Sequence, residues 1–184
     1  MDSTPDEIAA EDRRFLLEFA RATIGGRLSD RSLPSPSPES AVLLEPRGAF
    51  VTLKIDGVLR GCIGHVVGVA PLWRAVRDNA VTAAFEDPRF PPLTLDELPH
   101  VRIEISVLTP LCTSAAEDVV VGYHGVLVER GASRGLLLPQ VPVEFGWDRE
   151  TFLDHTCRKA GLEPKCWRQA DTTISTFSAE VFGE

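Results

Sequence analysis

Residues able to carry out chemistry are concentrated in segment 60–65, whose sequence is RGCIGH. A cysteine thiolate is a strong nucleophile, and the cationic Arg60 nearby would favour the thiolate of Cys62. Gly61 and Gly64, one on each side of this cysteine, allow a sharp backbone bend and the close approach of a ligand. The opposite interpretation also stands, because a cysteine in a glycine-rich strand is commonly buried. The segment therefore indicates either a nucleophile or a packing residue.

Four further residues could assist such a thiol. His65 and His124 are candidate bases, although a histidine at a hairpin tip, where His124 is expected, is by default a turn residue. Arg89, in the sequence DPRFPP, either donates to carbonyl groups of its proline-rich loop or clamps an anion. Glu104 is either a solvated residue on an outward strand face or a general base. The predicted binding residues are Arg60, Gly61, Gly64, Arg89 and Glu104.

The four cysteines, at positions 62, 112, 157 and 166, include no CxxC pair. No export signal opens the sequence and its core is large enough without bridges, so we expect reduced cysteines and a cytoplasmic protein. The spacing of Cys62 and His65 suits two ligands of a metal ion, but two further ligands at a regular spacing are missing from the sequence. His155 and Cys157 lie two apart on a predicted helix and point in different directions. The sequence therefore predicts no metal site.

Charge and hydropathy exclude several classes of protein. The chain has 19 Lys and Arg against 27 Asp and Glu, which gives a net charge of −8. No basic stripe exists that could neutralise a nucleic acid backbone, so generic nucleic-acid binding is not expected. No apolar run reaches the ~18 residues that a membrane span needs, so we expect no membrane association.

Hydrophobic periodicity predicts the elements that must position these residues. Residues 49–55 and 58–64 read as two strands joined by a turn at Asp56-Gly57, and residues 101–108 alternate as a third strand. A helix follows Pro71 and ends before Asp87-Pro88, and another spans residues 6–28 with Gly25-Gly26 ending its regular pattern. Hairpins with segregated helices favour an α+β fold, mainly antiparallel, with flanking helices.

The second half of the chain gives weaker signals. Residues 119–123 and 126–130 flank His124-Gly125 and predict a second hairpin, and residues 173–182 predict a last strand. Asp148 is expected to cap a helix that ends near residue 160, with Gly161 just beyond it. We therefore expect an N-terminal helical segment at 1–32, a Pro/Ser-rich connector at 33–46 and a core domain at 47–184.

Three segments of the chain resemble the AMMECR domain family, whose prokaryotic members are called AmmeMemoRadiSam system protein A. They are FVTLKIDGVLRGCIGHV, DNAVTAAFEDPRFPPLTLDELPHVRIEISVLTP and HGVLVERGASRGLLLPQVPVEFGWDRETFLDHTCRKAGL. The combination of LRGCIG, DPRFPP and LLLPQV at these separations is specific. The resemblance covers roughly residues 8–183, so the core at 47–184 is expected to be of the AMMECR type.

The resemblance implies an α+β fold with a larger and a smaller lobe around a cleft, and it marks Cys62 as a candidate site residue. It also implies pathway partners, namely a Memo-like protein and a radical S-adenosylmethionine protein, with RNA or metabolite modification as the shared process. Many family members carry Ser or Thr where this chain has His65, which favours His65 as a local base. An enzyme centred on Cys62 and a non-catalytic, protein-binding adaptor both fit, and neither the sequence nor the resemblance identifies a cofactor.

Overall fold

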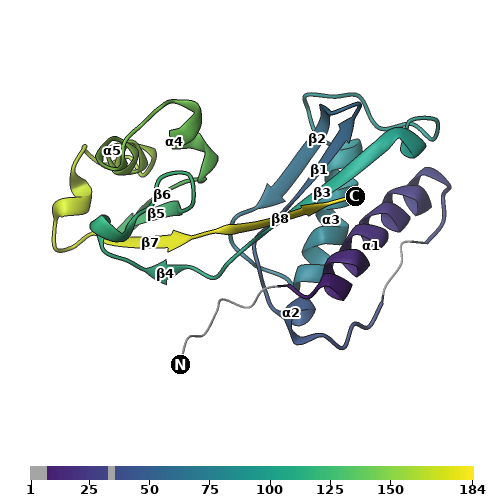
Figure 1. Ribbon diagram of the computed structural model, residues 1–184, viewed down its shortest axis with the longest axis horizontal. Helices are drawn as coiled ribbons and strands as arrows, with labels where there is room; N and C mark the ends of the chain where they lie inside the picture. Colours follow the sequence, from purple (N-terminus) through teal and green to yellow (C-terminus); the bar gives the residue numbers. More distant parts are fainter. Residues whose placement is uncertain (1–7, 33–35) are drawn as a thin grey trace. The chain divides into compact units, whose positions relative to one another are not determined.

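The computed structural model describes residues 8–32 and 36–184, and the protein consists of two compact units. The larger unit contains the described residues up to Leu108 together with Glu180–Glu184, and the smaller contains Thr109–Ala179. Within the described residues the strands form two antiparallel sheets of four strands each, with helices packed against them (Figure 1). The expected α+β fold with a larger and a smaller lobe is confirmed, whereas the expected cleft and the three-part domain division stay predictions.

The sheet of the larger unit has the strand order β2-β1-β3-β8, which leaves β2 at one edge. Its strands are β1 (Ala49–Ile55), β2 (Val58–His65), β3 (Val101–Leu108) and β8 (Ala179–Gly183). The Asp56-Gly57 turn joins β1 to β2 as predicted, with both residues at positive φ. The helices of this unit are α1 (Ala10–Leu28), α2 (Ala41–Leu44), α3 (Leu72–Phe85) and the 3-10 turn η1 (Leu98–His100).

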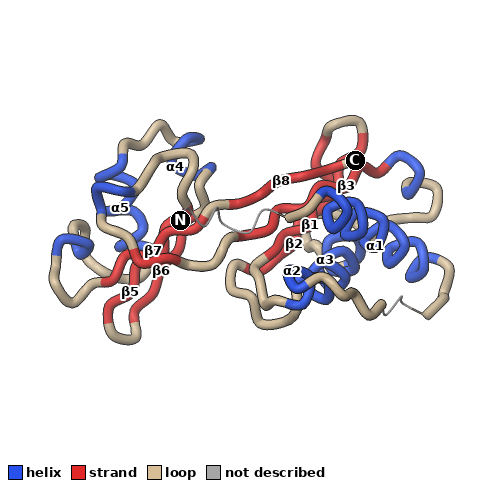
Figure 2. The backbone as a smooth tube through the Cα atoms, turned by 60° about the horizontal axis from the view of Figure 1, so that its bottom comes forward, coloured by secondary structure: helices blue, strands red, loops and turns tan. Residues whose placement is uncertain are grey.

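Helices α1 and α3 cover one face of this sheet (Figures 1 and 2). Alternation along β3 places Ile103 and Ile105 in the core beside Val51 of β1, and each of the three is at most 1% exposed. The residues between them face the other side, as predicted. Helix α3 ends at Phe85 because Pro88 follows shortly after and cannot continue it.

The predicted end of the first helix at residue 28 is confirmed, since helix α1 runs from Ala10 to Leu28 and continues through Gly25 and Gly26. Residues 6 and 7 of the predicted helix lie outside the described residues, and residues 8 and 9 are not helical. Ile24 is fully buried and Leu28 packs against the same core. Tertiary packing therefore outweighs the weak helix propensity of the two glycines.

The sheet of the smaller unit has the order β4-β7-β5-β6. Its strands are β4 (Cys112–Thr113), β5 (Gly125–Arg130), β6 (Ser133–Leu137) and β7 (Thr173–Phe177). The helices are α4 (Gln140–Glu144), α5 (Arg149–Lys159) and the 3-10 turns η2 (Ala116–Asp118) and η3 (Cys166–Arg168). Asp148 caps α5 by accepting from the N–H of Thr151 at 2.8 Å, and Gly161 follows the helix at φ 76°, both as predicted.

Two strand predictions in this unit are wrong. Residues 119–123 form turns rather than a strand, because Gly122 adopts a φ of 83°, and β5 pairs with β6 and β7 instead. The predicted strand 173–182 is two strands, β7 and β8, which belong to different sheets. Ser178 separates them, and its N–H donates to the hydroxyl of Thr109 rather than to a strand ladder.

The expectation of reduced cysteines is wrong for one pair, since Cys157 and Cys166 form a disulfide. Gly161 turns the chain back after α5, so that the Cα atoms of the two cysteines lie 6.0 Å apart, within the range that a bridge needs. Among the described residues, Cys62 and Cys112 carry no disulfide. No described helix is both long and apolar enough to traverse a lipid bilayer.

Candidate functional site

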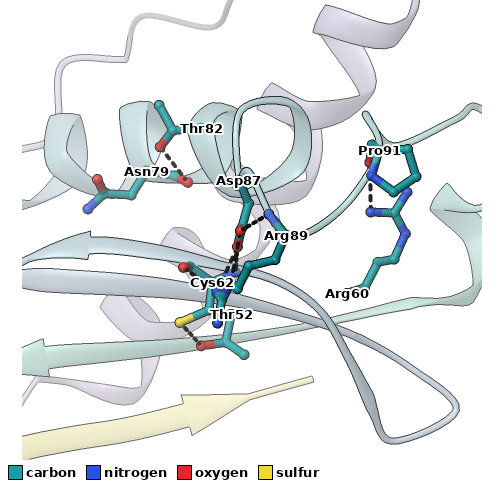
Figure 3. Close-up of polar contacts among 8 residues, drawn as sticks. All are labelled: Thr52, Arg60, Cys62, Asn79, Thr82, Asp87, Arg89 and Pro91. Atoms are coloured by element: carbon teal, nitrogen blue, oxygen red, sulfur yellow. Dashed lines mark hydrogen bonds and ion pairs between the residues drawn. The ribbon is translucent and has the colours of Figure 1, made fainter.

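Cys62 lies in strand β2, at the edge of the first sheet, and its side chain is half-buried. The strand pairs with β1 through an irregularity between Leu53 and Lys54, and Arg60 is the additional residue. This bulge places Cys62 opposite Thr52 rather than opposite Val51. Because neighbouring residues of a strand face opposite sides, the thiol lies on the face away from helix α3 (Figure 3).

A row of three polar side chains crosses this face. Thr52 of β1 pairs with Cys62 of β2 on one side and with Glu104 of β3 on the other. The hydroxyl of Thr52 donates to Cys62 Sγ at 3.2 Å, and Glu104 forms an ion pair with Lys54 at 3.0 Å. We call Cys62, Thr52 and Glu104 the thiol row. It brings together two predicted site residues and adds Thr52.

The backbone of Cys62 is held from the open side of β2 by a pair of charged side chains. Its N–H donates to Asp87 Oδ2 at 2.9 Å, and its carbonyl oxygen accepts from an Nη of Arg89 at 3.1 Å. Arg89 also donates to both carboxylate oxygens of Asp87, at 2.9 and 2.7 Å. Asp87 and Arg89 therefore act on Cys62 as a neighbouring strand would (Figure 3).

Asp87 is buried, and Arg89 compensates its charge. The hydrogen bonds from Arg89 and from the backbone N–H of Cys62 hold the pKa of Asp87 well below its usual range, against the opposing effect of burial. Of the two roles considered for Arg89, its hydrogen bonds to a carbonyl and a carboxylate of its own surroundings fit the structural one, and anion binding stays a prediction.

Arg60 is likewise engaged. It forms an ion pair with Glu97 at 2.8 Å and donates to the carbonyl oxygen of Pro91 at 2.9 Å. The hydrogen bond from Arg60, supported by those from Thr94, lowers the pKa of Glu97 to about 2. The guanidinium of Arg60 thus fixes the proline-rich loop to β2. Its ion-pair partner is the carboxylate of Glu97 and not the thiol of Cys62.

The two glycines beside Cys62 make room for the protein itself. A Cβ on Gly61 would lie 2.2 Å from the carbonyl oxygen of Ala83, so Gly61 lets helix α3 approach the strand closely. A Cβ on Gly64 would lie 2.3 Å from the carbonyl oxygen of Ala49 and would clash with Phe50. The space beside both glycines is filled by α3 and by β1, and a ligand contact of Gly61 or Gly64 stays a prediction.

The two candidate bases lie elsewhere. His65 is three residues beyond Cys62 and therefore faces the opposite side of β2, where its Nδ1 lies 3.2 Å from Oδ1 of Asn79. It borders a small cavity of about 100 Å³ that Asn79 and Arg47 also line. His124 belongs to the smaller unit, and its Nδ1 accepts from the N–H of Val120 at 3.0 Å. It closes a turn there, which is the default role considered above.

Sequence reasoning missed Thr52, Asp87 and Asn79. The Asp56-Gly57 turn predicts a regular register for β1 and β2, in which Cys62 would pair with Val51. The bulge shifts this register by one residue, so that Cys62 pairs with Thr52 instead. Asp87 stands two residues before Arg89 and could have been grouped with it, since buried charges occur in pairs. Among residues 8–32 and 36–184, no three His, Cys, Asp or Glu side chains gather as metal ligands would.

Comparison with known proteins identifies relatives along most of the chain. Residues 17–182 match the AMMECR1 family. Protein PYRAB00100 of Pyrococcus abyssi is 43% identical over 190 residues, which cover 97% of this chain and 93% of that protein. Protein MK0488 of Methanopyrus kandleri is 43% identical over 189 residues, with coverages of 97% and 91%.

A solved structure shows the same fold. The crystal structure of the uncharacterized protein PH0010 from Pyrococcus horikoshii superposes with a TM-score of 0.74 at 43% sequence identity. The match covers 96% of this chain and 93% of that one. With a family match over residues 17–182 and relatives above 40% identity along nearly the whole length, the chain belongs to the AMMECR1 family.

Proposed function

We propose that this protein is a thiol-dependent enzyme in which Cys62 is the nucleophile. The observation that supports this is the thiol row, in which Thr52 donates to the sulfur and Glu104 lies one strand further along the same face. In the proposed step the hydroxyl of Thr52 turns from the sulfur, passes its own proton to Glu104 and takes the proton of the thiol, which leaves the thiolate of Cys62 as the nucleophile and Glu104 protonated. In this proposal Arg60, Arg89, His65 and His124 act through the contacts described above and not on the substrate.

The position of Cys62 suits a nucleophile because its backbone is fixed on both sides. Strand β1 pairs with it on one side, and Asp87 and Arg89 bind its N–H and carbonyl groups on the other. A nucleophile held in one geometry needs little reorganisation when it reacts. We further propose that the reaction belongs to an RNA- or metabolite-modification pathway, shared with a Memo-like protein and a radical S-adenosylmethionine protein.

Alkylation kinetics test the thiol. The protein is treated with iodoacetamide at pH 7 under native conditions, and modification of each cysteine is followed by mass spectrometry. Cys112 is the internal control, because it is exposed and has no disulfide whereas Cys62 is half-buried. Accessibility alone therefore predicts that Cys112 reacts first, and an activated thiol predicts that Cys62 does.

Two variants connect the rate to the thiol row. Thr52→Val removes the hydroxyl that bonds the sulfur and Glu104→Gln removes the proposed proton acceptor, so each should slow the alkylation of Cys62 several-fold and leave Cys112 unchanged. If Cys62 reacts more slowly than Cys112, or only after denaturation, it is a packing residue and the enzyme proposal fails.

A second candidate function is a non-catalytic adaptor, which a surface of the smaller unit favours. Val120, Tyr123, Val143 and Phe145 are 53–65% exposed, and Gly122 lies against Val143. Exposed apolar side chains that gather in this way are typical of protein-binding surfaces. Tyr123→Ser and Phe145→Ser should then weaken co-purification with a Memo-like partner while the alkylation of Cys62 stays unchanged.

A further inference from the structure

The smaller unit contains a cavity of about 690 Å³ whose lining includes no residue of the thiol row. Three regions form its walls: the first turns of helix α5, the 3-10 turn η3, and the segments at the ends of β4 and β7. Cavities that bind metabolites have volumes of roughly 300–1,000 Å³. The cavity is therefore large enough for a small organic ligand.

Two arginines line this cavity from different elements. Arg149 begins α5, and one of its Nη groups donates to the carbonyl oxygen of Glu117 at 2.7 Å. Arg168 belongs to η3, where it pairs with Glu150 at 2.9 Å and stacks on Trp167 with its guanidinium carbon 4.5 Å from the ring centre. A guanidinium has five N–H donors, so each arginine keeps donors beyond those it uses here.

Hydroxyl groups also line the cavity, those of Thr113, Ser114, Thr172 and Thr173. The hydroxyl of Ser114 is already bonded to Cys112 and Thr176, whereas that of Thr172 is unpaired among the described residues. Thr172 Oγ1 is buried and has no hydrogen-bond partner within the part of the chain that the structure describes. Buried polar groups in proteins are nearly always paired, so this hydroxyl has hydrogen-bonding capacity that a group bound beside it would use.

The walls are held together before any ligand arrives. The disulfide between Cys157 and Cys166 joins α5 to η3. Asp154 of α5 accepts from Nε1 of Trp167 at 2.7 Å and from the N–H of Lys165 at 2.8 Å. The two arginines are therefore carried by elements linked covalently and by hydrogen bonds, and a preformed site loses less entropy on binding.

We propose that this cavity is a second ligand site, which binds a small metabolite through one oxyanion group, either a phosphate or a carboxylate. Arg149, Arg168 and the hydroxyl of Thr172 donate to its oxygens. Two carboxylates, Glu117 and Glu150, also line the cavity, so it has no excess of positive charge. A polyanion such as nucleic acid needs that excess, whereas a single oxyanion does not.

The test titrates the ¹⁵N-labelled full-length protein with sodium phosphate, and separately with sodium acetate, at constant pH and ionic strength. Backbone amides are followed by NMR. We expect saturable shifts at Arg149, Glu150 and Thr172, with the amides of the β1–β3 sheet unmoved. Tighter binding of phosphate identifies a phosphate ester as the ligand class, and tighter binding of acetate identifies a carboxylate.

Matched variants decide whether the shifts come from this cavity. Arg149→Gln and Arg168→Gln should each raise the apparent Kd about tenfold, since each removes a charge-assisted hydrogen bond. Thr172→Val keeps the side-chain shape and should weaken binding less. Arg134→Gln is the control, because Arg134 pairs with Glu129 at 3.0 Å and is not part of the cavity lining.

The spectrum of each variant reports whether it has folded, and Thr172→Val decides the matter if an arginine variant has not. Shifts that do not saturate with either anion overturn the proposal. So does binding that none of the folded cavity variants weakens relative to Arg134→Gln. The alkylation of Cys62 is independent of this test, so the two proposals can fail separately.

Discussion

The carboxylate of Asp87 accepts a hydrogen bond from the backbone nitrogen of Cys62, with 2.9 Å between the two atoms. The two residues are 25 positions apart in the sequence, and Arg89 completes the contact by donating to the carbonyl oxygen of Cys62. This relationship joins the RGCIG segment to the DPRF segment. The second segment holds the backbone of the first in place.

Asp87→Asn should destabilise the protein by about 1–3 kcal/mol at pH 7, because it removes the charge that Arg89 pairs with and weakens the bond to a buried N–H. Urea denaturation measures this. Asp78→Asn is the matched control, since Asp78 is exposed and pairs with the adjacent Arg77. Equal stability of Asp87→Asn and the wild type would show that the contact contributes nothing.

The same carboxylate predicts a dependence on pH. Its pKa is lowered in the folded protein, so its contribution to stability is fully present above the unfolded value of about 3.9 and is lost as the pH falls below it. The wild type should therefore lose stability below pH 4 more steeply than Asp87→Asn. Urea midpoints measured between pH 6 and pH 3 check this, and parallel curves would contradict it.

Replacing either of two glycines by alanine should change the stability of the protein, but in opposite directions. Gly61→Ala should cost about 1–3 kcal/mol, because its Cβ would lie 2.2 Å from the carbonyl oxygen of Ala83 and force helix α3 away. Gly26→Ala lies within helix α1 with its nearest neighbour 3.8 Å away, and should stabilise by about 0.5–1 kcal/mol. Thermal unfolding of both variants measures the two changes. A shift of the midpoint in the same direction for both variants would contradict the prediction.

Ile105→Ala should destabilise by about 2–5 kcal/mol, since Ile105 is fully buried on the core face of β3. Arg102→Ala on the opposite face of the same strand should change stability by less than about 0.5 kcal/mol. Denaturant unfolding of the two variants measures the difference. Comparable effects would mean that the two faces of β3 are not distinct.

Reduction of the Cys157–Cys166 disulfide should cost about 2–3 kcal/mol, the loop-closure value for a separation of nine residues. Thermal unfolding with and without a reductant measures this, and the Cys157→Ser/Cys166→Ser variant should not respond. The denatured, unreduced protein should expose two thiols, those of Cys62 and Cys112. Four reactive thiols would show that the bridge does not form.

Strands β1, β2 and β3 of the larger sheet could be predicted from the sequence, because each is marked by a pattern of neighbouring residues. Alternating apolar residues define β3 and both of its faces, and the Asp56-Gly57 turn defines the hairpin. The bulge at Arg60 was not accessible, since nothing in the local pattern shows an additional residue. A shift of one residue reverses the face of every side chain that follows, and so the position of Cys62 depended on it.

The other features that the sequence did not predict depend mostly on contacts between residues far apart in the chain. The partner of the Cys62 backbone lies 25 residues away, and the bridge between Cys157 and Cys166 depends on a turn at Gly161 that brings two elements together. The turn at Gly122 had the apolar flanks of a strand, and the positive φ of the glycine decided otherwise. Periodicity describes which residues share a face, but not which distant residues meet.

The Asp87–Arg89 pair has one further consequence for the behaviour of the protein in solution. Strand β2 is an open edge with Val58 69% and Leu59 37% exposed, features that invite pairing with a strand of another molecule and hence aggregation. At Cys62 the outward N–H and carbonyl groups are already occupied by side chains of the same chain. An approaching strand therefore finds the N–H at this position already bonded and its path beside Cys62 occupied by two side chains, which opposes pairing at the middle of the edge.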